Sequence, residues 1–223
     1  PSPLGYSSAG EVVEVYDQHS KFRVGDIVAC AGTTAAHAEL VVVPENLCAQ
    51  IPKGVSAKHA AYTTVGAIAL QGIRRADLRL GESCAVIGLG LIGQLTVQML
   101  KASGINVIGI DIDPKTVDLA IKSGADVSIQ RSDASLDQKI LNNTDGYGVD
   151  SVIITAGTKS LDPVELAGRI CRRRGKVIIV GAVPTGFSRE NYYMKELSLL
   201  MSTSYGPGRY DANYEEKGLD YPI

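Results

Sequence analysis

Residues 84–94 read Cys-Ala-Val-Ile-Gly-Leu-Gly-Leu-Ile-Gly-Gln, an apolar run closed by glycines at the spacing G-x-G-x-x-G. This spacing alone is a weak signal. Here it follows a strand-like run and opens a helix-like run, which is the context that a dinucleotide-binding loop requires. Gly88 permits a tight turn, Gly90 lets backbone amides approach a pyrophosphate, and Gly93 lets the helix pack closely on the strand. The first turn of the helix then offers N–H groups to the phosphates.

A carboxylate follows the loop at the distance expected for binding the ribose of a dinucleotide. The apolar run 106–111 ends in Asp111, 18 positions after Gly93. This side chain can accept hydrogen bonds from both ribose hydroxyls and would repel a 2′-phosphate, so it favours NAD over NADP. Asp113 is predicted to cap the next helix, which leaves Asp111 spare. The alternative is that the glycines only make a turn and that Asp111 only caps the helix.

Short apolar runs without alternation follow one another from residue 84 onward, as expected of strands buried on both faces. They span residues 84–88, 106–111, 125–129, 150–155 and 176–183, with a further run at 198–201. Asp113-Pro114 and Asp162-Pro163 mark helix starts between them, and Gly175 is predicted to stop the second helix after Arg172, Arg173 and Arg174. Strands and helices that alternate in this way predict an α/β fold with a doubly wound parallel sheet.

The other strand ends of such a sheet line the same crevice. The predicted cofactor-binding residues are therefore Gly88, Gly90, Leu91, Ile92, Gly93, Asp111, Thr155, Ala156, Gly181, Ala182, Val183 and Ser204. For the small residues at 155–157 and 181–183, ordinary strand-to-helix turns are the alternative interpretation.

The first 55 residues have a β pattern instead. Residues 11–16 alternate, 22–26 predict a turn, 27–30 are short and apolar, and 38–43 are rich in valine. This region predicts part of a small barrel or sandwich. Ser56 is predicted to cap a helix that follows it.

Composition excludes several classes of partner. The net charge is −2 with both signs scattered, so neither nucleic acid nor a membrane surface is favoured as a partner. The sequence has no apolar run long enough to span a bilayer. None of the four cysteines forms a C-x-x-C pair, which argues against a structural zinc site and suits a reducing compartment. The sequence therefore predicts a cytoplasmic protein.

The order of these stretches resembles the medium-chain dehydrogenase/reductase superfamily, the relatives of zinc-type alcohol dehydrogenases. The matching segments are 10–15, 22–29, 38–44, 60–64 and the 88–93 loop with Asp111. The resemblance implies a partial GroES-like catalytic domain at 1–55, a Rossmann domain at 56–205 and a tail at 206–223. More narrowly, residues 204–210 and 214–223 resemble the dehydrogenase module of two-module oxidoreductases found with bacterial polysaccharide genes.

The resemblance also indicates what differs. Zinc-dependent members carry Gly-His-Glu where this sequence has Gly5-Tyr6-Ser7, and their third catalytic ligand would fall near Thr63 and Thr64. Hydroxyl groups are poor zinc ligands, and His19, His37 and His59 do not restore the set, so we expect no metal site. Tyr6 is then a candidate proton donor, with Thr63 and Thr64 as a hydroxyl relay. A packing role for Tyr6 is equally open.

The resemblance implies an NAD-dependent oxidoreductase, or its cofactor-binding core, that acts on an alcohol or carbonyl substrate, possibly sugar-derived. The alternatives are a dinucleotide-binding module without catalysis and a zinc-free, NADPH-dependent enzyme like a quinone reductase. Relatives are longer at both ends, so this chain is expected to be truncated, and the last sheet strand could pair in a homodimer.

Overall fold

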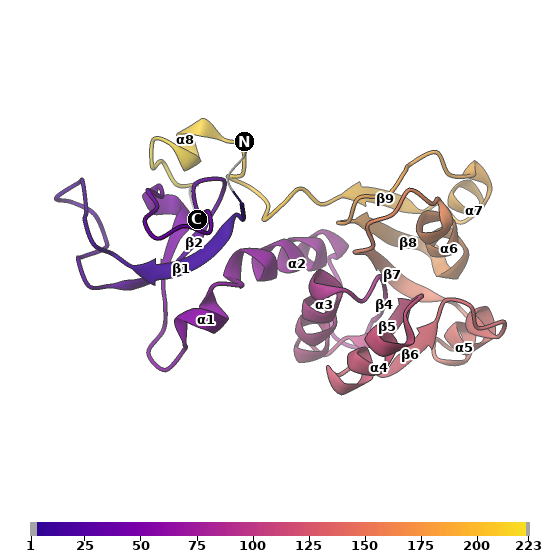
Figure 1. Cartoon of the computed structure of the whole chain (residues 1–223). Helices are drawn as coiled ribbons and strands as arrows, with labels where there is room; N and C mark the ends of the chain where they lie inside the picture. The colour runs from indigo at the N-terminus through magenta and orange to yellow at the C-terminus, as the bar shows by residue number, and fades with distance from the viewer. Residues whose placement is uncertain (1–3, 222–223) are drawn as a thin grey trace. The chain divides into compact units, whose positions relative to one another are not determined.

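The computed structural model describes residues 4–221, and Figure 1 shows its course. Contacts within the chain divide it into two compact units. The first comprises Pro1–Ala67 and Tyr205–Ile223, and the second comprises Ile68–Ser204. The segment after Tyr205 thus belongs with the N-terminal residues in space, although the whole second unit separates them in sequence.

The second unit contains a parallel sheet of six strands among the described residues, in the order β6-β5-β4-β7-β8-β9. Taken in chain order, this is the Rossmann order 3-2-1-4-5-6. The prediction of a doubly wound parallel sheet is therefore confirmed. The strands are β4 (Ser83–Ile87), β5 (Asn106–Asp111), β6 (Val127–Gln130), β7 (Val149–Ile154), β8 (Cys171–Ile179) and β9 (Ser198–Met201).

Helices cover both faces of this sheet, as the ribbon in Figure 1 shows. They are α2 (Thr63–Ala76), α3 (Leu91–Ala102), α4 (Pro114–Lys122), α5 (Leu136–Asn142), α6 (Asp162–Ile170) and α7 (Arg189–Met194). Alternate residues of β4 face opposite ways. Cys84 and Val86 pack with residues of α2, α3 and α4, while Ala85 and Ile87 pack with residues of α5, α6 and α7. This two-sided burial explains why the strand sequences are uniformly apolar.

The first unit contains a small antiparallel sheet in the order β1-β2-β3, with β1 (Ser7–Glu11), β2 (Ile27–Ala31) and β3 (Cys48–Gln50). Shorter elements surround it: the 3-10 helix η1 (Glu45–Leu47), α1 (Ala57–Ala60) and α8 (Ala212–Glu215). The C-terminal segment is attached here because the Asn46 side chain donates to the carbonyl of Tyr214, and the Tyr214 hydroxyl donates to the carbonyl of Asn46.

Two predicted strands of this unit are wrong. β1 ends at Glu11, so residues 12–16 lie outside it, and 38–43 form no strand. Valine favours strands, but a strand also needs a partner for its backbone groups. In the described chain residues 38–43 pair with none of the strands β1, β2 and β3. Leu40 and Val42 consequently remain 76% and 89% exposed.

Helix boundaries also differ from prediction. Ser56 caps α1 as expected by accepting from the amide of His59, but α1 ends at Ala60 and α2 begins only at Thr63. Asp113 caps α4 as predicted. Asp162, in contrast, lies inside the first turn of α6 and pairs with Arg131. The predicted stop at Gly175 is wrong: α6 ends at Ile170, and the three arginines lie in β8.

The early end of α6 has a clear physical cause. The Lys195 ammonium donates to the carbonyls of Gly168, Arg169 and Cys171 at 3.1, 2.6 and 2.9 Å. The carbonyls of Gly168 and Arg169 belong to the last turn, where carbonyls have no partner within the helix, and that of Cys171 directly follows it. A cation at this end also interacts favourably with the helix dipole. A lysine distant in sequence therefore ends the helix, a contact that local sequence patterns do not reveal.

Replacing Lys195 by methionine is expected to lower the free energy of unfolding by about 2 kcal/mol, because three carbonyls lose a charged donor. Urea denaturation measures the change. Lys139→Met is the matched control, since Lys139 makes an ion pair with Asp133 while half exposed. Its loss should be below about 0.5 kcal/mol. Equal losses in the two variants would contradict this role for Lys195.

Candidate functional site

The glycine loop lies where the strand order of the large sheet reverses, between β4 and β7. Gly88 follows β4 with φ +97°, and a Cβ added there would lie 2.5 Å from the amide nitrogen of Ala156. The Thr155 hydroxyl donates to the carbonyl of Gly88 at 2.5 Å. The ends of β4 and β7 are thus joined at the switch point, which is where open α/β sheets bind ligands.

The remaining two glycines of the loop have different surroundings. A Cβ on Gly93 would lie 2.0 Å from the carbonyl oxygen of Gly88, so α3 packs directly on the loop backbone. A Cβ on Gly90 would have no heavy atom within 4 Å among the described residues. Gly90 is the N-cap of α3, and within residues 4–221 no side chain accepts a hydrogen bond there. The first amides of α3 therefore have no capping side chain among the described residues.

Gln94 is a loop residue that the sequence analysis missed. Its side-chain amide donates to the carbonyls of Leu89 and Thr116, and the residue is 8% exposed. These bonds tie the glycine loop to the neighbouring helix α4. Its Oε1 atom has no hydrogen-bond partner among the described residues. A polar residue directly after the third glycine, at the start of a helix that should be buried, was the signal that could have indicated this role.

Asp111 lies beside the loop, but it is not spare as predicted. One carboxylate oxygen accepts from the amide of Leu89 and the other from the amide of Asp113 at 2.9 Å. An ionised carboxylate has about four lone-pair sites, so these two bonds leave capacity for two further donors. The carboxylate therefore orders the loop and can still accept from a ligand.

The ends of three neighbouring strands come together at this edge. A Cβ on Gly181, after β8, would lie 2.1 Å from the carbonyl oxygen of Ala156, and Gly88 touches Ala156 from the other side. Ala182 accepts from the amide of Thr158. Val183 packs against the core cluster of one sheet face instead of standing free. Ser204, with φ +47°, is the last residue of the unit.

The three predicted catalytic residues all lie in the first unit. Tyr6 is 48% exposed, and the neighbouring Ser7 hydroxyl donates to the carbonyl of Ala61 at 2.6 Å, just before α2. Thr63 is exposed, whereas Thr64 is 2% exposed and donates to the carbonyl of Cys30 at 3.2 Å. The start of β1 and the start of α2 are thus neighbours in space.

The residues of the chain do not fit a zinc site. Between residues 4 and 221, no group of three or more His, Cys, Asp or Glu side chains is arranged to hold a metal ion. The positions that the resemblance assigns to zinc ligands carry the hydroxyls of Tyr6, Thr63 and Thr64, and zinc prefers thiolate, imidazole or carboxylate.

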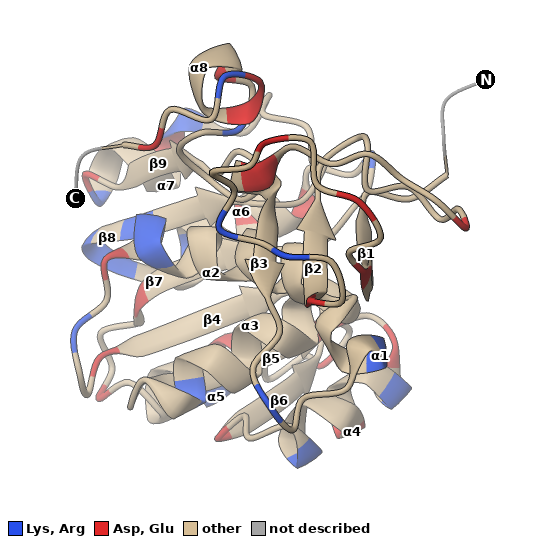
Figure 2. Ribbon diagram, turned by 90° about the vertical axis from the view of Figure 1, so that its left-hand side faces the viewer, with Lys and Arg blue, Asp and Glu red and all other residues tan. Residues whose placement is uncertain are grey.

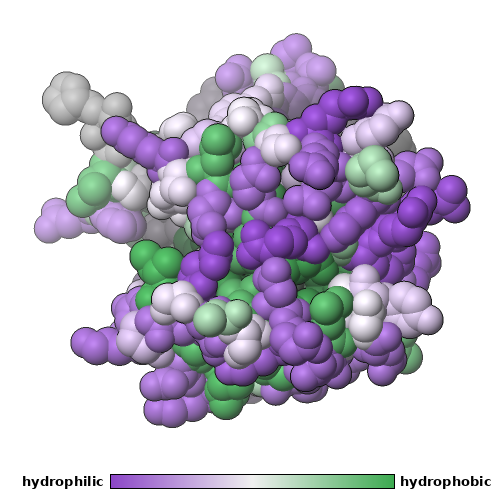
Figure 3. All heavy atoms as spheres, turned by 90° about the vertical axis from the view of Figure 1, so that its right-hand side faces the viewer, coloured by the Kyte–Doolittle hydropathy of each residue, from purple (hydrophilic) through white to green (hydrophobic). Residues whose placement is uncertain are grey.

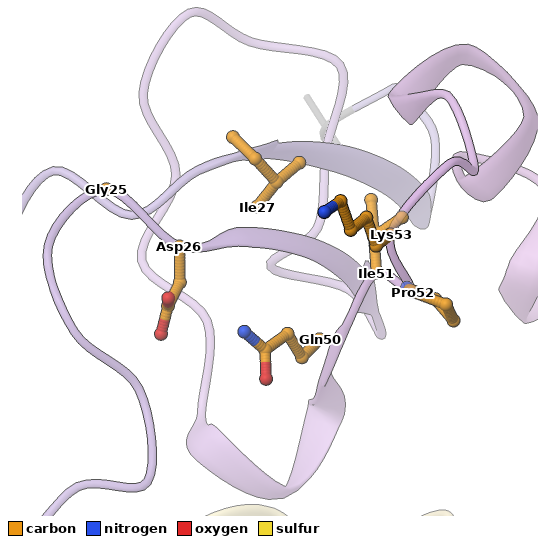
Figure 4. A pocket seen from close by; sticks show the side chains of 7 residues that line it. All are labelled: Gly25, Asp26, Ile27, Gln50, Ile51, Pro52 and Lys53. Carbon is orange, nitrogen blue, oxygen red and sulfur yellow. The ribbon is translucent and has the colours of Figure 1, made fainter.

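Two cavities lie away from the glycine loop. One, of about 530 Å³, is formed in the first unit by the turn before β2 and the end of β3, and Figure 4 shows its lining, which includes Asp26, Gln50 and Lys53. The other, of about 770 Å³, lies in the second unit around α7 and is lined by Arg173, Arg189 and Tyr193 among others. Neither brings together a set of catalytic groups.

Charged residues of both signs occur along the described chain. Acidic and basic residues are interspersed along the ribbon in Figure 2. On the face in Figure 3, hydrophobic residues are visible between hydrophilic ones. Among the described residues, no helix is both long and apolar enough to cross a bilayer.

Comparison with known proteins defines the class of this protein. The family model described as "Zinc-binding dehydrogenase" matches residues 92–217, more than half of the chain. The chain belongs to this family of dehydrogenases, within the medium-chain dehydrogenase/reductase superfamily. The resemblance noted in the sequence is thereby confirmed.

Individual curated relatives share about a third of their aligned residues with this chain. The chain is 30% identical over 155 residues to the D-guloside 3-dehydrogenase of Escherichia coli (strain K12). The aligned region covers 69% of this chain and 44% of that protein. It is 34% identical over 150 residues to a quinone oxidoreductase of Pseudomonas aeruginosa. That alignment covers 66% of this chain and 46% of the relative. The chain thus matches less than half the length of these curated relatives.

A solved structure supports the fold. It is named as a zinc-binding dehydrogenase from Sinorhizobium meliloti 1021 bound to NADP. It superposes with a TM-score of 0.78 at 24% identity and covers 91% of this chain and 68% of that one. At this identity the likeness concerns the fold alone, which is a Rossmann sheet preceded by a GroES-like β region.

Proposed function

We propose that this chain is the cofactor-binding core of an NAD-dependent oxidoreductase that acts on an alcohol or carbonyl group. The observation that carries the proposal is the open space at Gly90, directly before an uncapped helix and beside a carboxylate at the end of β5. A glycine without a side chain lets the backbone approach a pyrophosphate, and the amides at the helix start can bind it. The carboxylate can accept hydrogen bonds from ribose hydroxyls.

The residues of this chain would divide the work of binding. The amides of Leu91, Ile92 and Gly93 would hold the pyrophosphate, and Asp111 would accept from the adenosine ribose. Thr155, Ala156, Gly181 and Ala182 would form the floor beneath the rest of the cofactor. A bound nicotinamide supplies hydride transfer, and the protein supplies its position and electrostatic surroundings.

Residues of the first unit would transfer the proton to or from the substrate oxygen. We assign Tyr6 as the candidate donor to the substrate oxygen, with the exposed hydroxyl of Thr63 as a relay. The buried Thr64 hydroxyl donates to the Cys30 carbonyl, so we propose that Thr64 positions the start of α2. These roles agree with a mechanism without zinc. The similarity to a D-guloside 3-dehydrogenase makes a sugar-derived alcohol the substrate class to test first.

Replacing Asp111 by alanine tests the cofactor preference. The wild-type chain is expected to bind NADH more tightly than NADPH, because the carboxylate accepts from the ribose hydroxyls and repels a 2′-phosphate. Asp111→Ala should weaken NADH binding at least about tenfold, which equals roughly 1.4 kcal/mol, and should narrow the gap to NADPH. Calorimetric titration of both nucleotides measures this, with the metal content determined on the same sample.

Asp113→Ala is the matched control for this titration, since Asp113 caps α4 two residues away and its side chain is exposed. It should cost about 1 kcal/mol of stability and leave the nucleotide preference unchanged. Tighter binding of NADPH than NADH by the wild-type chain would contradict the assignment to NAD.

A second candidate is an NADPH-dependent enzyme like a quinone reductase. It is favoured by the similarity to the Pseudomonas aeruginosa quinone oxidoreductase and by the relative solved with NADP. The same titration separates it from the first candidate. Absorbance of the reduced nicotinamide during incubation with alcohols, polyols or quinones then separates either enzyme from a module that binds a dinucleotide without turning it over.

The oligomeric state and the location of the protein are two further proposals. β9 pairs only with β8 among the described strands, so its other edge could join a second copy in a homodimer, which sedimentation analysis would detect. A cytoplasmic location stays a prediction that rests on the pattern of cysteines.

A further inference from the structure

Two cysteines lie opposite each other in the small sheet. Cys30 of β2 and Cys48 of β3 are register partners, and their sulfur atoms are 3.9 Å apart. Cys30 is 8% exposed, whereas Cys48 is only partly buried. The sequence separates them by 18 positions, so only the pairing of the strands reveals the contact.

The register places this pair where a disulfide fits. The amide of Ile51 donates to the carbonyl of Ile27 in the same register. Antiparallel ladders alternate between bonded and non-bonded pairs, so the pair three positions along is non-bonded. In such pairs the Cα atoms are about 4.5 Å apart. Disulfides span Cα separations of about 4.4 to 6.8 Å, so side-chain rotation can bring the sulfurs to about 2.05 Å.

The two thiols are also chemically unequal. The two sulfur atoms are within hydrogen-bond distance of each other, and this contact lowers the pKa of Cys30 and raises that of Cys48. A thiol with a lowered pKa is the more reactive nucleophile. The other two cysteines lie in the second unit, where burial raises the pKa of Cys84 and raises that of Cys171 to about 12. Only the pair in the small sheet combines proximity with a reactive member.

We propose that Cys30 and Cys48 form a reversible disulfide whose oxidant is a hydroperoxide. The Cys30 sulfur attacks the terminal oxygen of the peroxide, the O–O bond breaks, and a sulfenic acid and an alcohol, or water, result. The Cys48 sulfur then displaces the sulfenic hydroxyl as water and the S–S bond forms. The two thiols lose two electrons and two protons, which the peroxide takes up. A thiol reductant reverses the step by disulfide exchange.

The location gives the modification a consequence that does not depend on the proposed activity. The carbonyl of Cys30 holds the hydroxyl of Thr64, and Cys30 is also the register partner of Ser8 in β1. A covalent link between β2 and β3 would therefore act on the strand that anchors the start of α2. The oxidation state of the pair can in this way reach the region where the proton step is proposed.

Hydrogen peroxide applied to the full chain tests the proposal. Free thiols counted after denaturation should fall from four to two per chain, and peptide mapping should link the peptides of Cys30 and Cys48. Dithiothreitol should restore all four. The mapping needs no variant, so it decides the matter even if a substituted chain fails to fold. Retention of four thiols, or a link that involves Cys84 or Cys171, would overturn the proposal.

Two variants sharpen the assignment. In Cys48→Ser the sulfenic acid at Cys30 has no resolving thiol, so dimedone should label Cys30 and no intramolecular link should form. Cys171→Ser is the matched control and should still lose two of its three thiols to the Cys30–Cys48 link. Equal dimedone labelling of Cys30 in wild type and in Cys48→Ser would show that Cys48 does not resolve the sulfenic acid, and would also overturn the proposal.

Discussion

Replacing Gly93 by alanine is expected to lower the free energy of unfolding by about 3 kcal/mol, because the new Cβ meets rigid backbone. It would lie 2.0 Å from the oxygen and 2.9 Å from the carbon of the Gly88 carbonyl. No side chain can move aside to relieve this contact, so α3 must shift away from the loop. Nucleotide binding should be lost together with stability. Urea denaturation and the fluorescence of bound NADH measure the two effects.

Gly90→Ala is the matched control, since it places the same methyl group three positions earlier in the same motif. Its φ of −68° suits alanine, and the new Cβ would have no neighbour within 4 Å among the described residues. Stability should fall by less than about 1 kcal/mol, whereas NADH binding should weaken strongly because the methyl group occupies the space proposed for the phosphates. If Gly90→Ala binds NADH like wild type, the proposed phosphate position is wrong.

Replacing Asp150 by alanine is the second change with a large expected effect. One carboxylate oxygen accepts from the amide and the hydroxyl of Ser83 at 2.7 and 2.8 Å, and the other accepts from Arg172 at 2.6 Å. The side chain therefore joins β4, β7 and the start of β8. Its loss leaves a nearly buried amide and a guanidinium without their acceptor, which should cost about 2 kcal/mol. Asp137→Ala, which breaks an exposed pair with Arg169, should cost about 0.5 kcal/mol.

The same residue predicts a pH dependence. Burial raises the pKa of Asp150, but hydrogen bonds from Ser83 and Arg172 together outweigh it, so the pKa is lowered in the folded chain. A carboxyl group with a lowered folded pKa stabilises the fold above its unfolded pKa of about 3.9, and this contribution is lost as pH falls through the folded value. The stability difference between wild type and Asp150→Asn should stay constant from pH 8 to 5 and shrink below about pH 4. A difference that grows in acid would contradict this reasoning.

Much of the second unit could be predicted from the sequence, because its elements are specified locally. Strands buried on both faces have uniformly apolar sequences, and Asp113-Pro114 marks a helix start by its own chemistry. The glycine motif is also local in its spacing, and Gly93 meets the Gly88 carbonyl within one strand–loop–helix unit. For this reason the doubly wound parallel sheet follows from sequence reasoning, whereas the order of its strands comes from the structure.

The contacts that sequence reasoning missed are between residues far apart in the chain. Lys195 ends α6 although it lies 24 or more positions beyond the carbonyls that it binds. The valine-rich run at 38–43 pairs with none of the described strands of the small sheet. The amide of Leu89 donates to the Asp111 carboxylate, 22 positions along the chain. Each of these depends on tertiary geometry, which local propensity does not contain.

The close contact of Gly88, Ala156 and Gly181 bears on how this protein could be altered. A methyl group on either glycine would meet backbone within 2.5 Å, so the ends of β4, β7 and β8 have no room for new side chains at these positions. Ile112, by contrast, follows Asp111 and is 77% exposed. Efforts to change cofactor choice by directed evolution should therefore vary the rim at 111 and 112, where diversity can be accommodated, and keep the floor invariant.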